Sequence, residues 1–347
     1  MKAVYFLGPK HIEVQEVPLR PLKREEVRIR VFACGVCGTD VHIYHSGKGS
    51  VDVTDPVILG HEFAGVITEL GEDAGIFQVG DHVTVDPNIY CGKCRPCRIG
   101  KKQMCENLHA VGVNQDGGFA QYCTVPQKQC YRLDPRTPLR LGALTEPLAC
   151  CIHGIDQAGI RHGDTVCVIG GGAIGLIMVQ LARLGGAGAV ILSEPEAMRR
   201  EIGLRLGADW AVDPVHEDMP ARVRELLGSD GADVVIECVG NMAATAQAFT
   251  AAGSGANILL FSVPKEDAQY AVKLEDVYRK ELTIMGSRIN PDTHQRAAQL
   301  IDSGKLQLEP LITHSFPVER LEEAIRTQMG PRSIKVLIEP DREAQEG

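Results

Sequence analysis

The sequence predicts an α/β domain with a doubly wound parallel sheet, joined to a second domain that is rich in β-strands. Two observations predict this combination. Short, alternating strands and frequent glycines fill the chain up to about residue 150. From about residue 160, apolar strands alternate with helical stretches, which is typical of a parallel sheet covered by helices.

The β-rich region begins with a clear strand signal. Residues 27–31, Val-Arg-Ile-Arg-Val, alternate with a period of two, as a half-buried antiparallel strand does. Further short strands are expected at residues 66–70, 82–85 and 121–125. Glycines at positions 60, 65, 71 and 80 separate these segments, so we expect a many-stranded, barrel-like domain with tight turns.

The α/β region begins at residues 164–169, an unbroken apolar strand suited to burial on both faces of a parallel sheet. A glycine-rich turn and a helix over residues 176–184 follow. The expected elements after these are a strand at 189–192, a helix at 199–206, and strands at 233–237 and 257–261.

The last fifty or so residues change character again. We expect an amphipathic helix at 295–303 and strands at 311–314 and 334–338. These are assigned back to the first domain. The predicted domains are therefore 1–150, 151–289 and 290–347, with the last segment returning to the first.

Composition excludes several classes of protein. The formal net charge is −9, which does not favour nucleic acid as a partner. No apolar run approaches the ~20 residues of a membrane helix, and Gly8-Pro9 interrupts the N-terminus before a signal-peptide core could form. We therefore expect a cytoplasmic protein without membrane contact. Its 12 cysteines are then expected to be reduced.

Four of these cysteines form a run, Cys91-x2-Cys94-x2-Cys97-x7-Cys105. Four thiolates can surround one tetrahedral Zn²⁺ and leave no position open, so we predict a structural zinc lobe at about residues 88–108. Alternatives are four unrelated surface cysteines or a zinc ribbon that binds nucleic acid, and the acidic net charge argues against the second.

A dinucleotide site is predicted at Gly170-Gly171-Gly172-Ala173-Ile174-Gly175, which fits G-x-G-x-x-G between a buried strand and a helix. Gly170 allows the tight turn, Gly172 lets backbone N–H groups approach a pyrophosphate, and Gly175 lets the helix pack on the sheet. Ile174 lies within the same turn. The helix N-terminus adds partial positive charge.

The nucleotide preference is predicted from Glu194, which ends the second strand of the sheet. A carboxylate there can accept both ribose hydroxyls and would repel a 2′-phosphate, so NAD is favoured. Arg199 and Arg200 follow closely and leave NADP as the alternative, because an arginine can hold that phosphate.

A second metal site is predicted from Cys37, His61 and Glu62, a thiolate, an imidazole and a carboxylate of the kind found around catalytic zinc. Cys34-x-x-Cys37 could instead be a thioredoxin-like redox motif. That alternative lacks its context, because the pair follows a strand in a β-rich region and is not expected to open a helix in a βαβ unit.

These features together resemble the zinc-dependent medium-chain alcohol dehydrogenase family, in its polyol (sorbitol or sugar-alcohol) dehydrogenase branch, over essentially the full chain. The motifs that carry the resemblance are Cys37-Gly38-Thr39-Asp40-Val41-His42, Gly60-His61-Glu62, the four-cysteine run, Asp116-Gly117-Gly118-Phe119-Ala120, Glu146-Pro147 and the glycine turn. The resemblance implies a GroES-like catalytic domain, a Rossmann cofactor domain and an active-site cleft between them.

The resemblance also implies roles for single residues. Cys37, His61 and Glu62 would hold the catalytic zinc, with Glu146 as a fourth ligand or one water away. Thr39 would pass the substrate proton towards the cofactor ribose and His42.

Further roles follow for the cofactor and the substrate. Glu194 and Arg199 match contacts to the adenosine ribose, and Lys335 would reach the pyrophosphate. Arg288 matches a substrate contact, whereas the tyrosine-type contacts of sorbitol dehydrogenases correspond to Ile43 and Ile289.

The implied reaction is oxidation of a secondary alcohol of a polyol, sugar alcohol or sugar acid to a ketone, with hydride transfer to NAD⁺. An L-threonine or 2,3-butanediol dehydrogenase is the alternative with the same mechanism, and a catalytically silent NAD-binding regulator is a third. Relatives suggest a homodimer or homotetramer.

Overall fold

The computed structural model describes residues 1–49, 51, 53 and 56–342. Within it the chain forms two compact units. The first comprises Met1–Ala149 and Pro291–Gly347, and the second comprises Cys150–Asn290. None of the helices among the described residues is both long and apolar enough to cross a bilayer.

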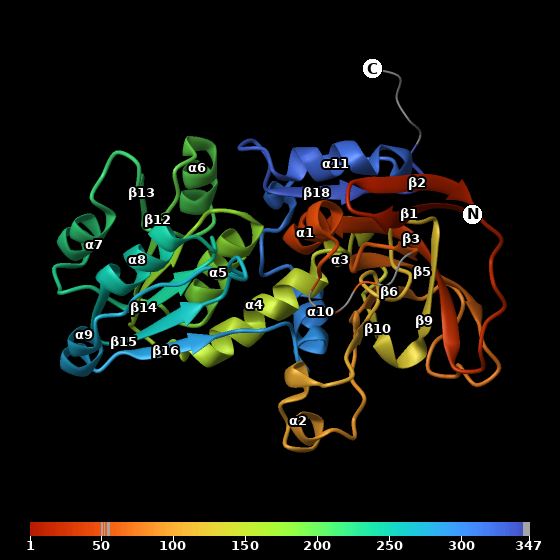
Figure 1. The fold of residues 1–347 in the computed structure, drawn as a ribbon, viewed down its shortest axis with the longest axis horizontal. Helices are drawn as coiled ribbons and strands as arrows, with labels where there is room; N and C mark the ends of the chain where they lie inside the picture. Colours follow the sequence, from red (N-terminus) through yellow and green to blue (C-terminus); the bar gives the residue numbers. More distant parts are fainter. Residues whose placement is uncertain (50, 52, 54–55, 343–347) are drawn as a thin grey trace. The chain divides into compact units, whose positions relative to one another are not determined.

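The first unit is built around β3 (Glu26–Val36), the longest strand, which pairs with three other strands. Its seven-stranded sheet has the order β10-β6-β5-β3-β18-β17, with β9 also paired to β3 (Figure 1). The other strands of this sheet are β5 (Glu62–Leu70), β6 (His82–Val85), β9 (Tyr122–Pro126), β10 (Cys130–Arg132), β17 (Ile312–Phe316) and β18 (Lys335–Ile338). Strands from both ends of the chain therefore meet in one sheet.

Two smaller sheets complete the β-structure of this unit. One has the order β2-β1-β4 and the other pairs β7 with β8. Their strands are β1 (Lys2–Gly8), β2 (His11–Glu16), β4 (Val57–Ile58), β7 (Asn88–Ile89) and β8 (His109–Ala110). The helices associated with this unit are α1 (Gly38–Ser46), α2 (Arg95–Arg98), α3 (Leu139–Gly142), α4 (Thr145–Ala158), α10 (His294–Asp302) and α11 (Leu321–Gln328), of which α4 continues into the second unit.

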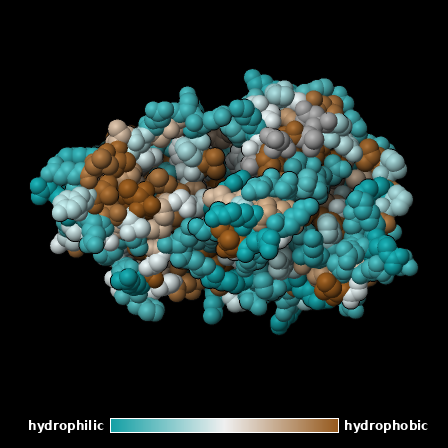
Figure 2. Space-filling view, turned by 60° about the horizontal axis from the view of Figure 1, so that its bottom comes forward, coloured by the Kyte–Doolittle hydropathy of each residue, from teal (hydrophilic) through white to brown (hydrophobic). Residues whose placement is uncertain are grey.

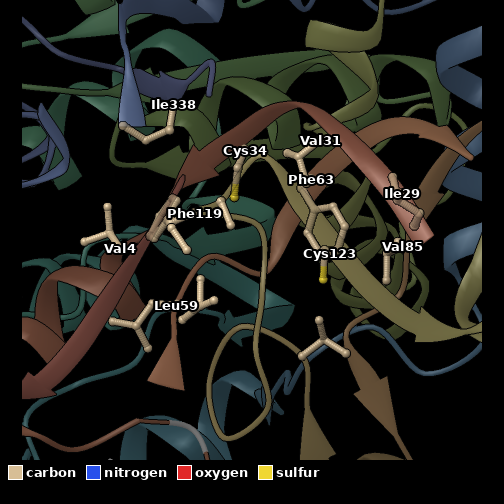
Figure 3. Close-up of a cluster of buried hydrophobic side chains, with 14 of the residues drawn as sticks. Val4, Ile29, Val31, Cys34, Leu59, Phe63, Val85, Phe119, Cys123 and Ile338 are labelled. Carbon is tan, nitrogen blue, oxygen red and sulfur yellow. The ribbon is translucent and has the colours of Figure 1, made fainter. Parts of the chain in front are cut away.

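The core of the first unit is apolar and continuous. Phe63 and Phe119 are almost fully buried and lie with Cys34 and Ile29 in one cluster (Figure 3). The side chains come from strands that are distant in sequence, such as β1 and β18. Burial of this apolar surface is the main driving force for closing the sheet.

The second unit contains a six-stranded parallel sheet with the order β13-β12-β11-β14-β15-β16. This order, with its reversal beside β11, is that of a Rossmann sheet and confirms the predicted doubly wound fold. Its strands are β11 (Thr165–Ile169), β12 (Ala189–Ser193), β13 (Trp210–Val212), β14 (Ala232–Glu237), β15 (Ala252–Leu260) and β16 (Thr283–Gly286).

Helices connect these strands, as a parallel sheet requires. They are α5 (Ala173–Leu184), α6 (Ala197–Arg205), α7 (Met219–Leu227), α8 (Met242–Ala251) and α9 (Leu274–Lys280). Helix α4 was not predicted from the sequence. Pro147 lies in its first turn, where a missing backbone N–H costs nothing, so this proline starts the helix rather than breaking it.

Candidate active site and metal centres

Three predicted ligands meet in the first unit. One ligand atom each from Cys37, His61 and Glu62 lies within 4.8 Å of the others. Cys37 follows β3 and caps helix α1, His61 directly precedes β5, and Glu62 is the first residue of β5. Antiparallel pairing of β3 with β5 brings these segments together, since Gly35 lies opposite Glu62.

Cys37 is fixed by the start of α1. Its backbone is extended, and its N–H donates to Asp40 Oδ2 at 2.8 Å, as in a capping box. The buried Asp40 also places Oδ1 3.5 Å from His61 Nδ1. That contact leaves Nε2 as the ring nitrogen available for a metal. The sequence analysis gave Asp40 no role, although the Cys37-x-x-Asp40 capping spacing signals one.

The imidazole of His61 is buried, and burial by itself lowers its pKa. Asp40 and Cys37 act in the opposite direction and leave the pKa of His61 well above its ordinary value. The surroundings of His61 therefore favour positive charge beside it, which a divalent cation can supply.

Glu62 has an ion-pair partner that the sequence did not predict. The ammonium Nζ of Lys335 lies 2.5 Å from Glu62 Oε2 and 3.3 Å from the carbonyl of Val36, and both charged side chains are almost fully buried. Burial lowers the pKa of Lys335, but Glu62, Cys37 and Glu146 together raise it above its ordinary value. The pyrophosphate contact expected for Lys335 remains a prediction, and the structure adds the ion pair with Glu62.

Close approach of Glu62 to β3 depends on Gly35. A Cβ at position 35 would lie 2.1 Å from Glu62 Oε2. Glycine is therefore required between Cys34 and Val36 for a steric reason, because any side chain at this position would displace the carboxylate of Glu62.

Glu146 lies in the first turn of α4 and is buried. It belongs to the first unit but is not among the three residues grouped within 4.8 Å. Thr39 and His42 both lie on α1, three positions apart, so they share one side of the helix. Thr39 is half-buried and His42 is exposed. The roles expected for these three residues remain predictions.

The structure gives two reasons against the redox alternative for Cys34-x-x-Cys37. Cys37 opens α1, but this helix follows an antiparallel strand and does not belong to a βαβ unit, in agreement with the sequence argument. In addition, Cys34 is a fully buried residue inside β3, and burial raises the pKa of its thiol well above the ordinary value. An inaccessible thiol with a raised pKa is a poor nucleophile, so the redox interpretation is not supported.

The four cysteines of the run also converge, with ligand atoms within 4.8 Å of one another. The sulfur of Cys94 lies 3.9 Å from that of Cys105, and the backbone N–H groups of Cys91 and Cys94 point at sulfur atoms of the group. Hydrogen bonds from the backbone of Lys93 and Cys94 lower the pKa of Cys91 to about 6. A thiolate is therefore favoured there, as metal binding requires.

The segment that carries these cysteines projects from the strands of the first unit, with α2 at its tip (Figure 1). Lys102 attaches it to the segment before α10 through a 2.5 Å ion pair with Asp292. All twelve cysteines of the chain are free of disulfide bonds.

The glycine turn of the second unit has the geometry that dinucleotide binding requires. Gly170 follows β11 with φ at 100°, a conformation that favours glycine, and Gly172 caps α5. A Cβ on Gly175 would lie 1.7 Å from the carbonyl oxygen of Gly170. Ile174 lies in the first turn of α5 and is half-buried.

Glu194 directly follows β12 and faces this turn. Its Oε2 accepts a 2.5 Å hydrogen bond from Gly171 N–H, and its Oε1 accepts one from Glu196 N–H. Arg199 Nη1 lies 3.9 Å from Glu194 Oε1, so a cation neighbours the carboxylate. Arg288 follows β16 in the second unit, and its substrate role remains a prediction.

Comparison with known proteins defines the class. Residues 23–135 match the alcohol dehydrogenase GroES-like domain, and residues 173–303 match the zinc-binding dehydrogenase domain. The chain is 35% identical to the sorbitol dehydrogenase of Halalkalibacterium halodurans, covering 96% of this chain and 97% of the relative. It is 34% identical to the L-threonine 3-dehydrogenase of Caldanaerobacter subterraneus, and the match covers 91% of this chain and 92% of the relative.

A solved structure extends this similarity to three dimensions. A zinc-binding dehydrogenase from Sinorhizobium meliloti, bound to NADP, matches with a TM-score of 0.94 and 38% identity over 98% of this chain and 99% of that one. The chain therefore belongs to the zinc-dependent medium-chain alcohol dehydrogenase family, in its polyol-dehydrogenase-like branch. It is an NAD(P)-linked oxidoreductase that acts on CH–OH groups.

Proposed function

We propose that this enzyme oxidises a secondary alcohol of a polyol, sugar alcohol or sugar acid to a ketone and reduces NAD⁺. The observation that carries the proposal is the group formed by Cys37, His61 and Glu62, a mixed donor set with one carboxylate. Similarity to a sorbitol dehydrogenase supports a polyhydroxylated substrate.

The donor set fits a catalytic zinc ion in number and chemistry, since three protein ligands leave a position open for substrate. When bound, zinc would act as a Lewis acid that lowers the pKa of a coordinated hydroxyl. Asp40 orients the ring of His61, and Lys335 balances the charge of Glu62. Glu146 would complete the ligand set directly or through water.

The proton released from the substrate needs a path to solvent. Thr39, half-buried at the start of α1, would accept it and pass it towards the cofactor ribose and His42, which is exposed one turn later. The helix holds both groups on one side, so the transfer requires no rearrangement of the backbone.

For the cofactor, the turn from Gly170 to Gly175 would bind the pyrophosphate at the N-terminus of α5. Glu194 would release Gly171 N–H and accept the ribose hydroxyls, and this favours NAD over NADP. Both nucleotides should be tested for two reasons. Arg199 lies next to Glu194, and a similar solved structure has NADP bound.

The four-cysteine group would hold a structural zinc, because four thiolates saturate a tetrahedral ion. The twelve free cysteines fit the reducing cytoplasm, which is the location we propose.

The deciding experiment measures NADH and NADPH formation with zinc-loaded enzyme across polyols, sugar alcohols, sugar acids, threonine and butanediol. We expect turnover with a polyhydroxylated substrate, and its loss in Cys37→Ser and His61→Ala with NAD⁺ binding retained. Full activity in either variant would refute the zinc site. Turnover with threonine or butanediol alone would establish the alternative that the threonine dehydrogenase relative favours. No turnover with any alcohol, but intact cofactor binding, would indicate the silent regulator.

We also propose a homo-oligomer that assembles through the exposed edge of the parallel sheet. Strand β16 pairs only with β15 in the described structure, and its Ile284 is 40% exposed. The preceding helix α9 carries Tyr278 and Leu274, which are 86% and 79% exposed, and Tyr278 and Thr283 line a surface hollow of about 720 Å³. Hydrophobic residues gather on the surface of this part of the second unit (Figure 2).

A second copy of this chain is the occupant that fits this edge. Helix α9 carries acidic residues in its first turn, Glu275 and Asp276, and basic residues in its last, Arg279 and Lys280. Two copies related by a two-fold axis would run antiparallel and oppose these charges. Strand β16 contains no charged residue or proline that would prevent edge pairing.

A further inference from the structure

A buried carboxylate in the second unit has no role in the reaction described so far. Glu237 is the last residue of β14 and is 2% exposed. Its Oε1 accepts hydrogen bonds from the backbone N–H groups of Val239 at 2.6 Å and Gly240 at 2.8 Å. Its Oε2 accepts a hydrogen bond from the hydroxyl of Ser262. One carboxylate therefore joins the turn after β14 to the turn after β15.

The two joined turns lie at the carboxyl edge of the sheet, beside the glycine turn. In the strand register, Ile169 of β11 lies opposite Glu237, which in turn lies opposite Leu260 of β15. A Cβ built on Gly170 would lie 2.7 Å from Cγ2 of Val239, so the turn after β14 packs directly against the glycine turn. Ligands of open parallel sheets bind along this edge.

The strand order shows which strands lie on each side of β11 along this edge. β12, followed by Glu194, lies on one side of β11, and β14 and β15 lie on the other. A dinucleotide spans both halves of such a sheet. If Glu194 binds the adenosine ribose, the other half of the cofactor lies over the turns that Glu237 joins.

We propose that Glu237 is a positioning residue for the nicotinamide half of the cofactor. It contacts no reacting atom itself. It fixes Val239, Gly240 and Ser262 so that the backbone beside the glycine turn is already in place when the cofactor binds. This inference rests on the proposed cofactor site.

The test compares binding of NADH and of ADP, which lacks the nicotinamide half, by isothermal titration calorimetry on the full zinc-loaded chain. In Glu237→Ala we expect the Kd for NADH to rise by about tenfold or more, because bonds to a charged acceptor are lost. The Kd for ADP should change by less than about twofold, because the adenosine half does not reach these turns. A general loss of folding would raise both constants together.

Two further variants separate positioning from stability. Glu237→Gln keeps a carbonyl oxygen for Val239 and Gly240 and can donate its amide to Ser262, so NADH binding should return to near the wild-type value. Asp233→Ala removes a carboxylate from the opposite end of the same strand, where Asp233 Oδ2 bonds Thr165 N–H and Oγ1, both at 2.7 Å. That control should lower the melting temperature without changing the ratio of the two constants.

The outcomes distinguish the two proposals. Wild-type enzyme that binds neither NADH nor ADP would overturn the cofactor site and this inference with it. Wild-type enzyme that binds both, together with a Glu237→Ala variant whose NADH affinity is unchanged or falls only in parallel with ADP affinity, would overturn the positioning role alone.

Discussion

At the scale of single residues, the geometry of the group formed by Cys37, His61 and Glu62 depends on a glycine that has no functional side chain of its own. Gly35 lies opposite Glu62 in the pairing of β3 with β5, and a Cβ there would overlap the carboxylate. We therefore expect Gly35→Ala to displace Glu62 and to lower zinc affinity at this site by about 10- to 100-fold, the range seen when the support of a ligand is lost. Metal analysis after dialysis against a weak chelator would measure this.

Gly38→Ala is the matched control for this prediction. Position 38 also lies beside the metal group, but a Cβ there would meet no atom within 4 Å. It should keep the wild-type zinc content. Equal zinc retention in both variants would contradict the steric argument.

The sequence predicted the three residues that converge in this group but not the residues that support them. Cys37, His61 and Glu62 are recognisable from residue type and local motif. The partner of Glu62 is Lys335, 273 positions away, and nothing in the sequence around Lys335 indicates a buried ion pair. This ion pair forms because β5 and β18 both pair with β3, and neither hydrophobic periodicity nor a local motif predicts that arrangement.

At the scale of elements, the strands were predicted best, because buried strands have distinctive runs of apolar residues. β11 and β14 were expected within one residue of where they lie. Helix α4 was missed, since its Glu146-Pro147 start and the paired Cys150 and Cys151 gave no clear capping signal. Short elements such as α9 and β16 were also missed, because they are mostly exposed and carry little periodicity.

The stability of the projecting cysteine segment is expected to depend on a bound metal ion. Its helix α2 has four residues and no buried ones, so it contributes little apolar packing. We expect Cys94→Ser to lose zinc at this site and to lower the melting temperature by about 2–4 °C, the shift that corresponds to roughly 1 kcal/mol in a domain of about 150–250 residues. Differential scanning fluorimetry and zinc analysis would measure both effects.

Cys150→Ser provides the comparison, because Cys150 is half-buried and lies in neither metal group. It should retain the full zinc content. The structural role would be refuted if Cys94→Ser melted at the wild-type temperature with its zinc unchanged.

Helix α10 carries a histidine whose burial predicts a pH dependence. His294 is fully buried beside Thr84 and Tyr131, and burial lowers its pKa from 6.5 to about 3. Below pH 6.5 the unfolded chain therefore binds a proton that the folded chain does not. His294 therefore leaves the free energy of unfolding unchanged above pH 6.5. As the pH falls from 6.5 towards 3, it lowers this free energy by up to about 1.4 kcal/mol per pH unit.

Urea unfolding between pH 7.5 and 5 would test this effect. In His294→Gln, whose amide can still bond Thr84 but does not titrate, stability should fall less steeply with pH than in the wild type. Identical slopes in the two proteins would show that His294 is not the group responsible.

At the scale of the whole molecule, the sequence indicated two kinds of domain and a return of residues 290–347 to the first, but not which strands the chain ends would pair with. β18 pairs with β3 and with β17, so the C-terminal strands complete a sheet that begins near residue 26. This pairing brings Lys335 of β18 to the ends of β3 and β5, where Cys37, His61 and Glu62 lie. Long-range pairing of this kind follows from burial of a common core rather than from any local signal.

The exposed edge of the second unit leads to the last prediction, which concerns assembly. Ile284→Lys places a charge in the middle of β16, where an antiparallel copy would have to bury it, and a buried unpaired charge opposes association strongly. We expect the wild type to have a mass by multi-angle light scattering that is a multiple of the 37.6 kDa chain, and this variant to approach the mass of one chain. Val79→Lys changes a residue of the first unit that is 60% exposed, and it should leave the wild-type mass unaltered. A monomeric wild type, or an Ile284→Lys variant of unchanged mass, would contradict assembly through this edge.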